Sequence, residues 1–107
     1  MSDQHSAPVP APGLDRRVNY LVESSGLGTK LLSEVAGLSG THLGQITKGK
    51  VSNPTGDTLG RLAVATGADL NWLILGDGEQ PPAEAVREAA ERAKTRATTA
   101  IADSAAT

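Results

Sequence analysis

The stretch from Thr29 to Lys48 constrains the fold of this chain more than any other part of the sequence. Apolar residues recur there at three- and four-residue intervals on both sides of Gly37, which is the spacing of one face of an α-helix and not of a strand. Gly37 can adopt a positive φ and end the first helix, Leu38 can fill the angle between the helices, and Ser39 is a good N-cap for the second. The sequence therefore predicts a helix-turn-helix.

The composition limits what can surround these two helices. The 107 residues are enough for one small domain with tails. Phe is absent and Trp and Tyr occur once each, so the core must be built from Leu, Val, Ile and Ala. The lack of Cys excludes disulfides and thiolate metal sites and fits a reducing cytoplasm, where we expect the protein to be located. We expect no signal peptide and no membrane span, because neither apolar pattern occurs.

The fold class predicted from the pattern is all-α. Residues 1–13 are rich in Pro, Ala and Ser without periodicity, which predicts a disordered arm. Residues 14–80 are expected to form one domain of five helices. The five helices are expected at residues 14–24, from about residue 29, at 40–48, from about 55–57 to 66, and at 70–75 after Asp69. Arg16 and Arg17 are expected on the outer face of the first helix, and Thr29 is a possible N-cap of the second. Trp72 is expected in the core.

Residues 81–107 are predicted to be an Ala-rich helical tail, partly disordered. A helix opened by Pro82 is expected to reach about Ala97 and to fray after Thr98. Its apolar positions are nearly all Ala, with Val86 the main larger residue, so we expect it to bury little surface and to be largely solvated. A packed dimerisation helix is the alternative.

Charge is distributed unevenly along the chain, whose formal net charge is −2. Residues 1–55 carry five bases against four acids, residues 56–80 one base against four acids, and residues 81–107 four of each. A nucleic-acid-binding protein usually has a basic face. The first half of the chain is therefore the weakly basic part in which such a face would be found.

Four segments in order resemble the Cro/repressor-type helix-turn-helix proteins, the XRE family. They are the helix-turn-helix at 32–46, Lys-Gly-Lys at 48–50, Asn-Pro-Thr-Gly-Asp-Thr-Leu at 53–59, and Asp-Leu-Asn-Trp-Leu-Ile-Leu-Gly at 69–76. The likeness covers about residues 14–79. Ser33 departs from the family's usual Ala where the two helices touch. The resemblance implies a compact five-helix, lambda-repressor-like domain that binds double-stranded operator DNA as a symmetric homodimer, with its third helix in the major groove.

The resemblance also implies which residues meet the bases. The family's base-reading positions match Gly40, Thr41, Gly44 and Gln45, and His42 is a further candidate on the same helix. A glutamine can pair with adenine N6 and N7, and a threonine can meet a base edge. The two glycines have two explanations. They let the helix lie closer to the floor of the groove, or this surface does not read bases.

Polar residues on both sides of the third helix are candidate phosphate contacts. The first of these, Thr29 and Lys30, open the second helix, where free N–H groups favour an anion. The others follow the third helix: Lys48, Lys50, Ser52, Asn53 and Thr55. Each lysine taken singly is also compatible with an ordinary solvated charge.

The dimer interface implied by the resemblance includes Asn71, Ile74 and Leu75, although Ile74 or Leu75 could instead complete the core. We expect no enzyme activity, cofactor or metal, because the two histidines stand in no catalytic or metal-binding pattern. The predicted function is a transcriptional regulator, most simply a repressor. The alternative is a protein-interaction module of the same fold, such as an antitoxin or adaptor that binds a partner protein through the C-terminal tail.

Overall fold

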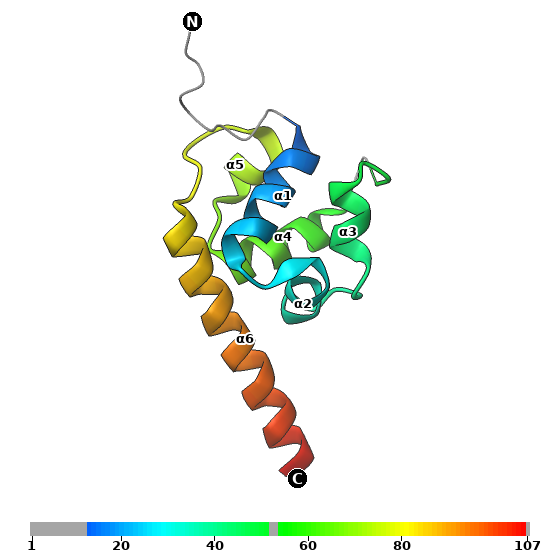
Figure 1. The fold of residues 1–107 in the computed structure, drawn as a ribbon, viewed down its shortest axis with the longest axis vertical. Helices are drawn as coiled ribbons and strands as arrows, with labels where there is room; N and C mark the ends of the chain where they lie inside the picture. The colour runs from blue at the N-terminus through cyan, green and yellow to red at the C-terminus, as the bar shows by residue number, and fades with distance from the viewer. Residues whose placement is uncertain (1–12, 52–53, 107) are drawn as a thin grey trace, which may run out of the picture.

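The computed structural model of the chain describes residues 13–51 and 54–106, with side chains described as far as Thr99. These residues form six α-helices: α1 (Leu14–Ser25), α2 (Gly28–Val35), α3 (His42–Thr47), α4 (Gly56–Thr66), α5 (Leu70–Leu75) and α6 (Ala83–Ala106) (Figure 1). The described part of the chain contains no strand, so the predicted all-α class is confirmed. Except for Gly13, the predicted disordered arm lies outside the described residues, as do Ser52 and Asn53.

Aliphatic side chains from α1 to α5 meet in one core, as the lack of Phe requires. The largest fully buried side chains are Leu21, Leu32, Leu43, Ile46, Leu62 and Leu73. Trp72 is also buried, as predicted, and its ring meets that of Tyr20 edge-on, with centroids 6.1 Å apart at 73°. Edge-to-face contact is a favoured arrangement of aromatic rings. The single Trp and single Tyr therefore anchor α5 against α1.

Gly37 ends α2 with a positive φ, as the sequence predicts. Gly37 adopts φ 84°, its N–H donates to the Glu34 carbonyl at 3.0 Å, and the Leu38 N–H donates to the Ser33 carbonyl at 2.8 Å. These two bonds form a Schellman motif, which supplies donors to the last carbonyls of α2. The chain then turns sharply enough for α3 to pack on α2.

The beginnings of α2 and α3 differ from the prediction. Leu27 and not Thr29 occupies the N-cap of α2, and α3 begins at His42 and not at Gly40. Ser39 does not cap α3, whose N-cap is Thr41 without a side-chain bond. The Leu43 N–H near the start of α3 instead donates to the hydroxyl of Ser33 on α2. The pattern of residues along one segment does not reveal such a contact between helices.

Arg17 is buried, although the periodicity of the first helix placed it on the outer face. Its Nε donates to the Leu73 carbonyl at 2.9 Å and its Nη2 donates to the Ile74 carbonyl at 3.1 Å. The last carbonyls of a helix have no partner within the helix. The guanidinium therefore completes the end of α5, which explains why a charged residue lies inside.

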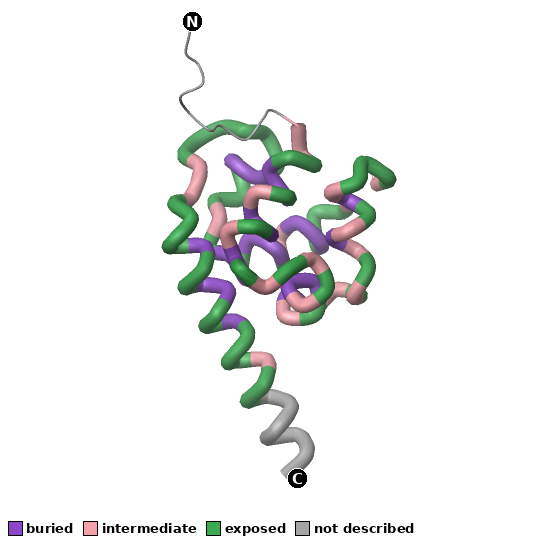
Figure 2. Tube along the Cα trace, in the orientation of Figure 1, coloured by how far each residue is buried: buried purple, intermediate pink, exposed green. Residues whose placement is uncertain are grey.

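The predicted solvation of the C-terminal helix is wrong for its first half. Figure 2 shows buried positions along this part of α6, and Val86, Ala89, Ala90 and Ala93 lie against the body of the molecule. The contacts are with α1, α4 and α2. A face of alanines buries little area per residue but lets two helices approach closely, so the helix shares the domain's core.

The second half of α6 leaves the body. The helix continues past Thr98, where fraying was expected, as far as Ala106 (Figure 1).

None of the described helices combines the length and the hydropathy needed to cross a lipid bilayer.

Candidate nucleic-acid interface

A groove of about 440 Å³ lies across the start of α2, the outer face of α3 and the segment after it. The residues that line it are Thr29, Lys30, Gly40, Thr41, Gly44, Gln45, Lys48 and Lys50. All eight are positions that the sequence marked as candidate base or phosphate contacts. The fold therefore brings together residues up to 21 positions apart in the sequence (29 to 50) on a single surface.

The groove is basic although the chain as a whole is acidic. Its lining includes three lysines and no acidic residue. Lys30, Lys48 and Lys50 are all exposed, and within the described residues none of them forms an ion pair. The groove between α1 and α6, by comparison, is lined by Glu23, Glu84 and Glu88 against a single arginine, Arg87. The two grooves therefore carry opposite net charge, and a basic face of this kind favours a negatively charged ligand.

The orientation of α3 follows from its two apolar residues. Leu43 and Ile46 are fully buried, which turns Thr41, Gln45 and Lys48 outward, where they are exposed. After α3, Gly49 adopts φ 75°, and the Lys50 N–H donates to the Gln45 carbonyl at 2.9 Å. This second Schellman turn brings Lys50 back beside Gln45 and Lys48.

The two glycines of this surface have different surroundings. A Cβ on Gly40 would lie 3.3 Å from Glu34 Oε2 and 3.4 Å from Lys30 Cγ, so this glycine lets the side chains of α2 cross the turn. A Cβ on Gly44 would meet nothing within 4 Å. A side chain at position 40 would therefore crowd the side chains of Glu34 and Lys30, whereas none of the described residues would crowd a side chain at position 44.

His42 is the one candidate base reader that does not line the groove. The residue is half-buried, and its Nε2 is buried without a hydrogen-bond partner among the described residues. This nitrogen is not available at the surface. Base contact by that atom would require the ring to turn.

Thr55, a further phosphate candidate, does not line the groove. Thr55 is exposed and is the N-cap of α4, where its hydroxyl accepts the Thr58 N–H at 3.2 Å and donates to Thr58 Oγ1 at 3.1 Å. Ser52 and Asn53 are outside the described residues. Thr55 therefore has a structural role that a phosphate contact would have to share.

The candidate dimer residues lie together on the solvent side of α5. Asn71, Ile74 and Leu75 are all exposed, with Leu75 68% accessible, so neither Ile74 nor Leu75 completes the core. Leu70, one turn before Ile74, is exposed as well. A short helix with three large apolar residues in solvent is an uncovered surface of the kind found at interfaces.

Sequence reasoning missed the features that depend on contacts between helices. The chief examples are the burial of Arg17, the contact of Ser33 with α3, and the packing of α6. For Ser33 a signal existed, because the sequence has a polar residue at a position where the two helices were expected to touch.

Comparison of the chain with protein-family models, characterised proteins and solved structures found no match.

Proposed function

We propose that this chain is a sequence-specific DNA-binding regulator, a repressor that occupies operator DNA as a homodimer and thereby blocks polymerase. In this proposal α2, the turn and α3 act as the helix-turn-helix of a lambda-repressor-like domain, with α3 in the major groove and α2 across the backbone. The observation that carries the proposal is the basic groove, where three lysines without an ion-pair partner among the described residues lie around the outward face of α3.

Some residues of the groove suit contacts with base edges, and others suit contacts with phosphates. Gln45 and Thr41 are exposed on α3 and have the donors and acceptors that base edges require. The lysines and Thr29, which lies in the first turn of the eight-residue α2, suit the phosphates on either side. Gly44 leaves the backbone of α3 open to close approach.

The small size of α3 is the reason for proposing two copies. Its six residues span about 9 Å, so one copy meets only a few base pairs. Two copies related by a two-fold axis would read half-sites about one helical turn, ~10 base pairs, apart or a multiple of that. The exposed face of α5, with Asn71, Ile74 and Leu75, is the proposed contact between them.

Selection of bound sites from random duplex DNA tests this function. We expect enrichment of a palindrome, and binding to it should weaken steeply with salt. If each lysine of the groove neutralises one phosphate, a dimer has six such contacts and the slope of log K against log salt is about −5. Failure of the folded protein to bind any duplex at low ionic strength would overturn the proposal.

A protein-interaction module of the same fold, an antitoxin or adaptor, is the second candidate function. It is favoured by the small number of base-reading side chains, because Gly40 and Gly44 contribute none and His42 Nε2 is buried. The same selection separates the two. Salt-sensitive binding without any enriched sequence would favour the module over the repressor.

A further inference from the structure

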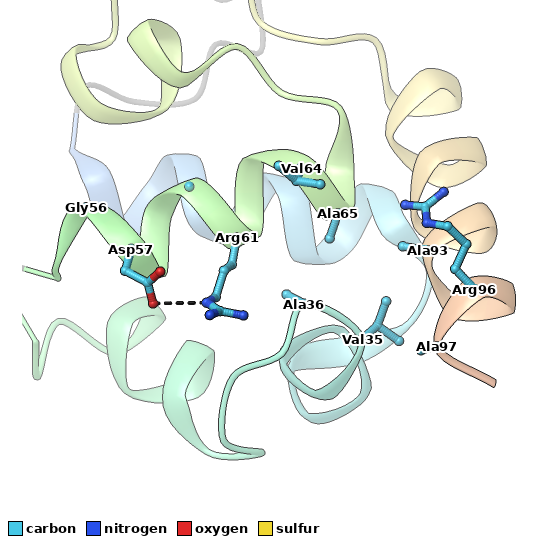
Figure 3. A pocket seen from close by; sticks show the side chains of 11 residues that line it. Val35, Ala36, Gly56, Asp57, Arg61, Val64, Ala65, Ala93, Arg96 and Ala97 are labelled. Carbon is cyan, nitrogen blue, oxygen red and sulfur yellow. Dashed lines mark hydrogen bonds and ion pairs between the residues drawn. The ribbon is translucent and has the colours of Figure 1, made fainter. Parts of the chain in front are cut away.

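A larger groove lies where α6 leaves the body of the molecule. It has a volume of about 690 Å³ and is bounded by the end of α2, the outer face of α4 and the middle of α6 (Figure 3). Most of its lining is apolar, including Val35, Val64 and Ala97. Val64 is 74% accessible, which makes it the most exposed large apolar side chain in the described part of the chain.

The charged residues at this groove leave one positive charge uncompensated. Arg61 Nε lies 2.9 Å from Asp57 Oδ2, one turn earlier on α4. Arg96 stands on the α6 side, is exposed, and has no ionic partner among the described residues. The groove is therefore suited to a segment of small apolar residues that carries a negative charge.

The second half of α6 has this composition. The helix has 24 residues, but the buried residues Val86, Ala90 and Ala93 all lie in its first half. The same spacing continues to Ala97, which is half-buried at the edge of the groove. From residue 97 to the end, the sequence consists of Ala, Thr, Ile and Ser with one charged residue, Asp103. A helical segment of this length is marginal in water without a packing partner.

The positions of Arg96 and Asp103 on α6 are compatible with a two-fold symmetric contact between two copies. Asp103 follows Arg96 by seven residues, which is two helical turns, so both positions lie on the same side of the helix. If two α6 helices lie antiparallel about a two-fold axis near residues 99 and 100, position 96 of each copy meets position 103 of the other. Such a contact is isologous and closes on itself.

We propose that the groove beside α6 receives the C-terminal half of α6 from a second copy of this chain, in an antiparallel two-fold contact. Val64, Val35 and Ala97 form its apolar floor, and Arg96 of each copy pairs with Asp103 of the other. This contact is separate from the α5 face and from the basic groove. It does not depend on whether the protein binds DNA.

Sedimentation equilibrium of the full chain tests the contact. Leu75→Glu is introduced first, because it removes the apolar centre of the α5 face and leaves the α6 groove as the remaining contact. In that background we expect a dimer. Adding Val64→Glu should raise the dimer dissociation constant at least about tenfold, because it places a charge on the apolar floor. Circular dichroism, compared at a concentration where both proteins are dimeric, should show unchanged helix content, since Val64 lies in solvent.

A charge exchange tests the antiparallel arrangement. Arg96→Asp and Asp103→Arg should each raise the dissociation constant several-fold, and the two changes together should restore it to within about threefold of the starting value. A Leu75→Glu protein that stays monomeric, or one whose association ignores Val64→Glu, would overturn the proposal. Weakening without rescue by the exchange would overturn the antiparallel pairing.

Discussion

The hydroxyl of Ser33, buried on α2, accepts a hydrogen bond from the backbone N–H of Leu43 on α3 at 3.3 Å. The first N–H groups of a helix have no partner within the helix. Neither Ser39 nor Thr41, the residues next to the start of α3, supplies a side-chain cap. Ser33 thus holds α3 against α2.

Ser33→Ala should destabilise the protein by about 1–2 kcal/mol, because it leaves the buried Leu43 N–H without an acceptor. The free energy of unfolding in urea measures this cost. Ser39→Ala is the matched control and should change it by less than about 0.5 kcal/mol, since Ser39 is exposed and caps nothing. Equal effects of the two substitutions would contradict the role of Ser33.

Arg17→Met should cost about 2–3 kcal/mol, because the carbonyls of Leu73 and Ile74 lose their charged donor. Thermal unfolding followed by circular dichroism measures the loss. The exposed neighbour Arg16→Met is the control and should leave the melting temperature nearly unchanged. Arg17→Lys should not rescue the loss, because an ammonium lacks the two-pronged geometry of a guanidinium.

Val86→Ala should lower the free energy of unfolding by about 2 kcal/mol, the value expected for two buried methyl groups and the cavity that they leave. Val86 is a residue of α6, and its side chain is fully buried in the core of the domain. Thr95→Ala, at an exposed position of the same helix, should have little effect. A neutral Val86→Ala would show that α6 is a tail and not part of the core.

Gly44→Ala should stabilise the protein by up to about 1 kcal/mol, because alanine favours a helix and the added methyl group meets nothing within 4 Å. Gly49 has equally open surroundings but adopts φ 75°, so Gly49→Ala should destabilise by about 1 kcal/mol through backbone strain alone. Urea unfolding of both variants gives the comparison. If α3 lies close to the base edges, Gly44→Ala should weaken DNA binding while it raises stability.

Gln45→Ala and Lys48→Ala should affect DNA binding differently. Loss of a bidentate contact to a base should cost about 1–3 kcal/mol on the selected operator and little on scrambled DNA. Loss of the Lys48 charge should weaken binding to both duplexes and reduce the salt slope by about 1 for each copy. Fluorescence anisotropy at two salt concentrations measures these quantities. Equal losses on operator and scrambled DNA for Gln45→Ala would exclude base reading by Gln45.

The sequence alone determined the order of the helices and the approximate positions of α1 to α5. The repeat of apolar residues at helical spacing located α1 to α5, and Gly37, Gly49, Gly67 and Gly76 adopt the positive φ values that end helices. Asp69 caps α5 through the Asn71 N–H, as predicted. These features follow from local sequence, because propensity and capping act over a few residues.

Only the tertiary structure decided which exposed-looking residues are buried and which distant residues meet. Arg17 and Ser33 form their hydrogen bonds with groups on other helices, and no periodicity within one segment contains that information. The alanines of α6 seemed too small to hold a helix in place, but their size is what lets α6 approach α1 and α4. The basic groove, likewise, exists because the turn at Gly37 folds Lys30 back toward Lys48 and Lys50, which concentrates on one surface the few positive charges of an acidic chain.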